Sequence, residues 1–108
     1  MLKQNSGTII NISSGLGKHG MEGNAAYCAS KFGLMGFTEC LDMEVKDKKI
    51  NISVVCPGQV NTPLFNFLGD EELKKKMLHP KDIAEMVMYL CKLPPNVKIK
   101  EVSVRPKM

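Results

Sequence analysis

Short apolar runs alternate with longer amphipathic runs along the chain. The short runs are rich in isoleucine and valine or alternate apolar with polar side chains, which is typical of strands. The longer runs place apolar side chains three and four positions apart, which is typical of helices. The pattern predicts strand 7–13, helix 24–47, strand 50–55, a short amphipathic segment 70–78, helix 80–92 and strand 97–104.

This order predicts an α/β fold with a parallel sheet of about three strands (β-α-β-α-β), because helical connections join parallel strands. Such sheets bind ligands at the carboxyl ends of their strands. Ser14 and the pair Pro57-Gly58 follow the first and second strands. We therefore expect both to lie at the ligand-binding edge, and the outer side of strand 7–13 to lack a partner strand.

Length and composition limit the classes of protein that fit. A chain of 108 residues with 44% hydrophobic and 24% charged residues makes at most one globular domain, taken as residues 1–108. The net charge is +4, but the lysine groups have acidic neighbours and Trp is absent, so nucleic-acid binding is not expected. No segment is apolar enough for a membrane span or a signal peptide, which predicts a soluble, cytoplasmic protein.

Four cysteines lack the spacing of a metal site. We expect them to be free thiols, buried or half-buried, in a reducing compartment, and we predict no metal centre.

Three polar residues form the strongest chemical signal. Ser14 precedes Tyr27 by thirteen residues, and Lys31 follows Tyr27 by four. Tyr27 falls in the first turn of the predicted helix, where the helix dipole favours negative charge, and Lys31 lies one turn further on the same face. A phenol beside an ammonium can exchange a proton with a substrate oxygen that a hydroxyl also contacts. The alternative is a surface Tyr–Lys pair and a serine that caps a loop.

Three motifs carry a resemblance to a known family. They are Asn11-Ile-Ser-Ser14, Tyr27-Cys-Ala-Ser-Lys31-Phe-Gly33-Leu34 and Pro57-Gly58-Gln-Val60-Asn-Thr62-Pro63. In this order and at this spacing they resemble successive signatures of the short-chain dehydrogenase/reductase family, over about residues 5–63. The resemblance implies a Rossmann-like sheet and an NAD(P)-dependent oxidoreductase that interconverts an alcohol and a carbonyl.

The resemblance also implies roles for individual residues. Tyr27 would be the proton donor or acceptor, Ser14 would orient and polarise the carbonyl, and Lys31 would assist the phenol and bind the nicotinamide ribose. The cofactor-binding set would be Tyr27, Lys31, Pro57, Gly58, Val60 and Thr62. The short ending after Leu93 is similar to that of members that often use NADP, so NADP is favoured over NAD. A small alcohol or carbonyl compound would be the substrate, and the complete protein would form a homo-oligomer.

The sequence departs from the family pattern at its beginning. The glycine-rich cofactor fingerprint that opens the family's domain is missing, so the resemblance covers the family's C-terminal half and Met1 resembles an internal position. The run Gly15-Leu-Gly17-Lys-His-Gly20 imitates that fingerprint but lies too far ahead of the helix, and we interpret it as a loop beside the active site. Two alternatives stay open: a truncated, inactive fragment or interaction module, and an epimerase or dehydratase with the same Tyr-Lys pair.

Overall fold

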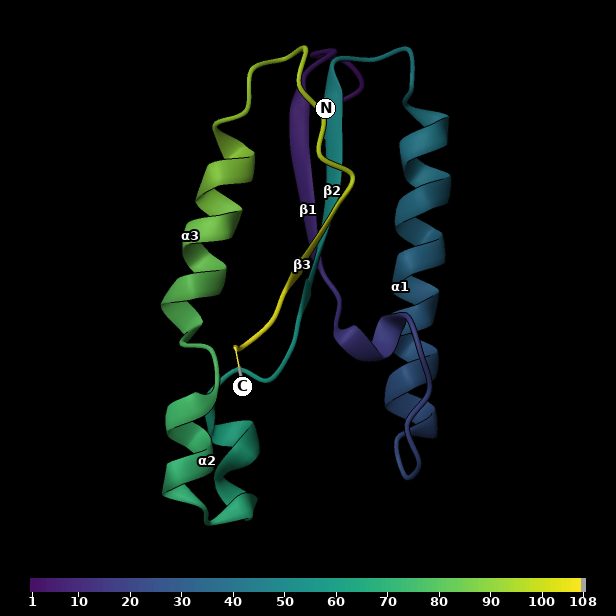
Figure 1. Cartoon of the computed structure of the whole chain (residues 1–108). Coiled ribbons are helices and arrows are strands. Elements are labelled where there is room, and N and C mark those ends of the chain that lie inside the picture. The colour runs from purple at the N-terminus through teal and green to yellow at the C-terminus, as the bar shows by residue number, and fades with distance from the viewer. Residues whose placement is uncertain (108) are drawn as a thin grey trace.

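A three-stranded parallel sheet forms the centre of the computed structural model, which describes residues 1–107. Its strands are β1 (Gly7–Ile12), β2 (Ile50–Pro57) and β3 (Glu101–Val104), in the spatial order β1-β2-β3. Both pairings are parallel, and Ile12 lies opposite Val55. The predicted α/β fold with a parallel sheet is confirmed (Figure 1).

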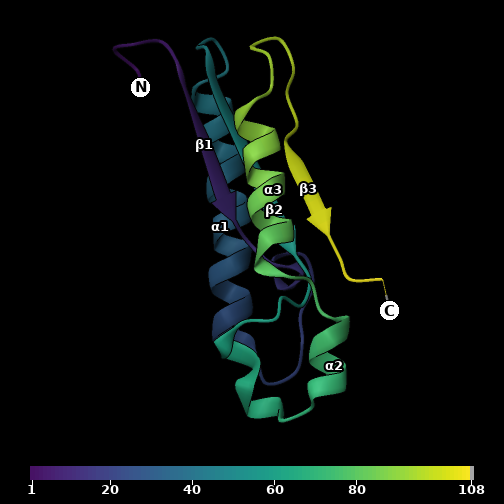
Figure 2. The same ribbon diagram turned by 90° about the vertical axis from the view of Figure 1, so that its left-hand side faces the viewer.

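Helices cover both faces of this sheet. α1 (Ala25–Glu44) and α3 (Pro80–Cys91) lie on opposite sides of it (Figure 1). The 3₁₀ turn η2 (Pro63–Leu68) and the short helix α2 (Glu71–Lys76) lie beyond the carboxyl ends of the strands (Figure 2). A second 3₁₀ turn, η1 (Gly15–Gly17), connects β1 with α1. Within residues 1–107, none of the helices combines the length and apolar character that crossing a membrane requires.

β2 forms the core because it lies between the other two strands and beneath both helices. Ile52, Val55 and Cys56 are the largest side chains that are almost completely buried. Burial raises the pKa of the Cys56 thiol, so this side chain is a neutral core residue rather than a nucleophile. All four cysteines are free, but Cys40 and Cys91 are exposed, which corrects the expectation that all are at least half-buried.

The last strand is shorter than predicted. It begins at Glu101 instead of residue 97. After two prolines the N–H of Val97 donates to Pro94 O at 2.9 Å and closes a turn. The chain first contacts β2 at Ile99, whose carbonyl accepts from Ser53 Oγ at 2.6 Å. Main-chain bonding to β2 begins at Lys100, whose carbonyl accepts from Val54 N at 2.9 Å. The turn therefore takes Val97, the first residue of the predicted strand, and residues 98–100 belong to no regular element.

The first helix matches its prediction at the beginning but ends earlier. Asn24 is the N-cap of α1, as expected, but its side chain makes no capping hydrogen bond and donates instead to Glu22 O at 3.2 Å. The helix ends at Glu44 rather than at residue 47, and residues 45–49 form a turn before β2.

The described chain is more extended than a typical domain of its length. Its radius of gyration is 15.6 Å, whereas a compact domain of this size has roughly 13 Å. Within residues 1–107 no strand pairs with the outer edge of β1, and Phe32 and Phe37 on α1 are about half exposed. The sheet therefore has an open edge at β1, and α1 exposes apolar side chains.

Candidate active site

The two serines at the end of β1 have different surroundings. Ser13 is buried and its hydroxyl donates to the main-chain oxygen of Lys31 at 3.3 Å. Ser14 is half-buried and its Oγ accepts from Leu16 N at 3.1 Å, so it caps η1, as the alternative interpretation predicted. A hydroxyl that accepts one hydrogen bond can still donate its proton. Ser14, and not Ser13, can therefore also bind a substrate oxygen.

Tyr27 and Lys31 lie together on the first two turns of α1. Tyr27 is 42% exposed, so its side chain is accessible. The Nζ atom of Lys31 lies 5.7 Å from the centroid of the Tyr27 ring. The same Nζ donates to Ile12 O at 3.1 Å, two residues before Ser14. Lys31 thus connects the tyrosine with the end of the strand that carries the serine.

Tyr27 lies in the first turn of a helix and beside an ammonium group. The first turn of α1 presents main-chain N–H groups that favour a negative charge. Lys31 contributes a full positive charge on the same face, and the ammonium has three donors, of which Ile12 O uses one. Two donors of the Lys31 ammonium are therefore left for other partners.

The loop after β2 provides the second part of the candidate site. Val60 forms a parallel bridge with Leu78, so the loop is fixed beside the residues that lead into α3. Thr62 is the N-cap of η2, yet its hydroxyl makes no capping hydrogen bond. The structure brings Tyr27 and Lys31 together and joins Lys31 to the end of β1, two residues before Ser14. It places residues 57–62 at the end of the adjacent strand β2.

Gly58 has a structural reason to lack a side chain. A Cβ atom at this position would lie 3.0 Å from Pro106 Cδ, which is tighter than ordinary packing. The N–H of Gly58 donates to Val104 O at 2.7 Å. Packing against the end of β3 therefore explains this glycine, and its contact with a nicotinamide ring stays a prediction.

The glycines after Ser14 form a packed turn rather than a phosphate-binding loop. Gly15 and Gly17 are buried in η1, and α1 begins only at Ala25. In a dinucleotide fingerprint the last glycine opens the helix directly. A Cβ atom at Gly17 would lie 2.5 Å from Ser13 Oγ and 3.1 Å from Lys31 O. Gly17 thus permits close contact between η1 and α1.

Gly17→Ala is expected to destabilise the protein by about 1–3 kcal/mol, because the added methyl group collides with Ser13 and with helix backbone. Gly20→Ala is the matched control, since no atom lies within 4 Å of its Cβ position. Urea unfolding of both variants measures the difference. Equal stabilities would show that η1 tolerates the methyl group and is not packed as described.

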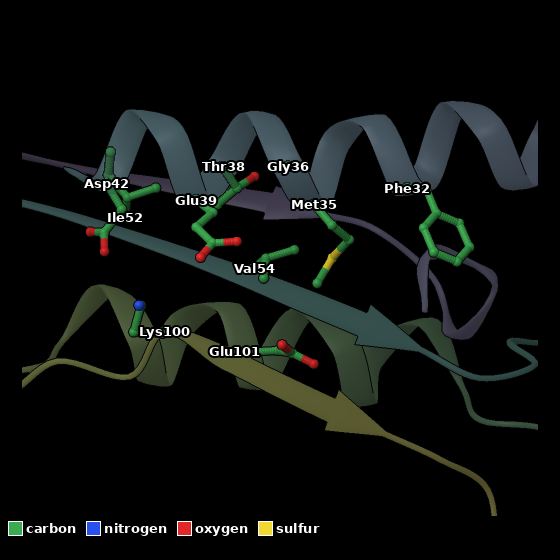
Figure 3. Close-up of a pocket in the computed structure, with 10 residues that line it drawn as sticks. All are labelled: Phe32, Met35, Gly36, Thr38, Glu39, Asp42, Ile52, Val54, Lys100 and Glu101. Atoms are coloured by element: carbon green, nitrogen blue, oxygen red, sulfur yellow. The ribbon is translucent and has the colours of Figure 1, made fainter. Parts of the chain in front are cut away.

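A groove of about 510 Å³ lies elsewhere, between α1 and the strands β2 and β3 (Figure 3). Met35 and Asp42 line it from the helix, and Val54 and Glu101 line it from the strands. Its lining includes none of Ser14, Tyr27 and Lys31. The three polar residues therefore do not share this groove.

Sequence reasoning missed three charged residues beside η1. Lys18, directly after η1, forms an ion pair with Glu101 of β3, and the Arg105 guanidinium lies against Gly15. The alternation of residues 101, 103 and 105 indicates that these side chains share one face of the strand. This alternation does not indicate that the shared face contacts η1.

The comparisons with known proteins agree with this fold and these motifs. A profile described as short chain dehydrogenase matches residues 1–73. The 3-oxoacyl-[acyl-carrier-protein] reductase of Bos taurus is 38% identical over 99 residues, which cover 87% of this chain and 42% of that protein. The chain therefore belongs to the short-chain dehydrogenase/reductase family, and it spans less than half the length of this relative.

Solved structures give the same result for the fold. Serine dehydrogenase complexed with NADP+ superposes with a TM-score of 0.81 and 27% identity, over 96% of this chain and 46% of that one. A variant of actinorhodin polyketide ketoreductase with NADPH gives a TM-score of 0.83 and 31% identity, over 98% and 48%. The sheet and its helices thus have the Rossmann-like arrangement that the motifs predicted.

Proposed function

We propose that this chain carries the catalytic residues of an NAD(P)-dependent oxidoreductase that interconverts an alcohol and a carbonyl compound. The supporting observation is the position of the Lys31 ammonium, which lies by the Tyr27 ring and is hydrogen-bonded to Ile12 O. This contact joins the proton-transfer pair on α1 to the last residue of β1, two positions before Ser14. Reductase names among the relatives support the same reaction class.

In the reductive direction Tyr27 donates its phenolic proton to the carbonyl oxygen as that oxygen becomes an alcohol. The Ser14 hydroxyl donates a hydrogen bond to the same oxygen and stabilises its developing negative charge. Lys31 stabilises the phenolate that is left. A bound nicotinamide cofactor would supply the hydride, and in the oxidative direction it would accept one.

The residues present fit the nicotinamide end of such a cofactor. Lys31 retains donors for ribose hydroxyls, and the Thr62 hydroxyl is not used in capping η2. The loop with Pro57, Gly58 and Val60 would lie against the ring. We favour NADP over NAD, because serine dehydrogenase and the polyketide ketoreductase were solved with NADP+ and NADPH.

The substrate proposed is a small alcohol or carbonyl compound. For the complete protein we propose a homo-oligomer in which α1 contributes to the subunit contact. The exposed apolar side chains of Phe32, Phe37 and Met43 on this helix support that proposal.

A second candidate is that the 108-residue chain alone is inactive and serves at most as an interaction module. The open edge of β1 and the extended shape favour it. Assays of turnover therefore use the protein produced in its natural host, with the 108-residue chain as a comparison. Turnover by the 108-residue chain alone would contradict this second candidate.

Ser14→Ala is expected to lower kcat by about 10²- to 10³-fold, because it removes a donor to the developing oxyanion. Ser13→Ala is the matched control. It removes a buried hydrogen bond, which lowers stability by about 0.5–1.5 kcal/mol, while kcat is retained. Steady-state kinetics and urea unfolding separate the two effects. Equal kcat values for the two variants would contradict the role of Ser14.

Analysis of the reaction product distinguishes the oxidoreductase from the remaining alternative, an epimerase or dehydratase that uses the same Tyr-Lys pair.

A further inference from the structure

The end of the chain contacts both segments of the candidate active site. We call residues 101–106, which comprise β3 and the two residues after it, the C-terminal brace. Ser14, Tyr27 and Lys31 lie within the three sequence motifs, whereas the brace lies outside all of them. Its three contacts reach η1 at two points and the loop after β2 at one.

The first contact is an ion pair at the end of η1. Lys18 caps the C-terminal side of this turn, and its ammonium donates to the Glu101 carboxylate. The side chains are 44% and 35% exposed, so the pair lies at the protein surface. The hydrogen bond to Glu101 raises the pKa of Lys18 above its ordinary value, as expected for an ammonium with a carboxylate acceptor.

The second contact is at the beginning of the same turn. A Cβ atom at Gly15 would lie 3.1–3.4 Å from three atoms of the Arg105 guanidinium, which therefore covers this glycine. Glu101 and Arg105 are four positions apart in an extended segment, so their side chains leave the same face. One face of the brace thus holds both ends of η1.

The third contact involves the loop after β2. Val104 O accepts from Gly58 N at 2.7 Å, and Pro106 Cδ lies 3.0 Å from the Cβ position of Gly58. The brace therefore links the turn that follows Ser14 with the loop expected to hold the cofactor.

We propose that Glu101 and Arg105 are positioning residues that hold η1 at both ends and thereby fix the orientation of the Ser14 hydroxyl. The hydrogen bond from Leu16 N to Ser14 Oγ lies inside the held turn, so movement of the turn changes the direction of the hydroxyl. The effect of this positioning on catalysis rests on the proposed function. The positioning of η1 does not depend on that function.

Charge reversal tests the brace in the 108-residue chain. Lys18→Glu and Glu101→Lys each place like charges together and are expected to speed hydrogen exchange of the Leu16 amide by about two- to fivefold. The double variant restores the ion pair with reversed polarity and returns the rate to that of the unmodified chain. The amide of Ser13, bonded to Val55 O in the sheet, keeps its rate throughout. NMR-detected exchange measures both amides.

Two matched controls accompany this test. Lys75→Glu disrupts an exposed ion pair with Glu72 on α2 and leaves Leu16 exchange unchanged. Arg105→Ala speeds Leu16 exchange, whereas Lys107→Ala, two residues further, does not. The proposal is overturned if the single reversals leave Leu16 unchanged, if the double variant fails to restore it, or if Ser13 exchange rises in parallel.

Turnover by the protein from its natural host gives the second readout. Each single reversal lowers kcat without changing the KM for cofactor, and the double variant restores kcat. If the Leu16 amide responds as expected but Tyr27→Phe keeps full turnover, the proposed function fails and the brace stands. If Tyr27→Phe is inactive and Leu16 is insensitive to the reversals, the brace fails alone.

Discussion

Tyr27→Phe lowers kcat by about 10²- to 10⁴-fold, because it removes the only proton that the proposed mechanism transfers from a side chain. The ring and its contact with Lys31 are retained, so cofactor binding changes little. Steady-state kinetics measure kcat, and the fluorescence of the reduced nicotinamide measures the dissociation constant of the cofactor.

Tyr89→Phe is the matched control for this substitution. Tyr89 is 58% exposed on α3, compared with 42% for Tyr27, and α3 covers the opposite face of the sheet from α1. Tyr89→Phe removes a phenolic hydroxyl and is expected to leave turnover unchanged. Substantial residual activity in Tyr27→Phe, or an equal loss in Tyr89→Phe, would remove Tyr27 from the proton-transfer step.

Ile52→Ala lowers the free energy of unfolding by about 2–5 kcal/mol, because a cavity forms where a buried aliphatic side chain was. Ile52 is 1% exposed and packs with Val45 and Ile50 at the centre of the small core. Domains are stable by only about 5–15 kcal/mol, so this loss is a large share of the total. Urea unfolding monitored by circular dichroism gives the value.

Met88→Ala provides the comparison, since Met88 is 53% exposed on α3 and its truncation leaves no cavity. The midpoint of urea unfolding of Met88→Ala stays close to that of the unmodified chain. Similar losses in both variants would mean that β2 is not the centre of the core.

Local patterns were sufficient to predict the parallel sheet and the proximity of Tyr27 and Lys31. A run of β-branched residues defines β1, and a four-residue spacing places Tyr27 and Lys31 on one helix face. The family resemblance favoured Ser14 over Ser13, and the structure shows that the two differ, because Ser13 is buried against the Lys31 carbonyl whereas Ser14 is half-buried. These features depend on residues that are close in sequence.

Contacts between distant residues could not be predicted in this way. Lys18 and Glu101 are 83 positions apart, and the buried Asp42 pairs with Lys98, 56 positions away. A charged residue has the same local pattern whether its partner is solvent or another side chain. The packing reasons for Gly17 and Gly58 depend likewise on neighbours that only the folded chain provides. The brace is therefore a finding of the structure.

Transfer of deuterium from the cofactor to the product tests the central proposal most directly. The protein from its natural host is supplied with a reduced nicotinamide cofactor whose transferable hydrogen is deuterium, together with a carbonyl substrate. The account predicts an alcohol with deuterium on the former carbonyl carbon, and none above background with Tyr27→Phe. An unlabelled product, an epimer or a dehydrated compound, with the deuterium still on the cofactor, would contradict it.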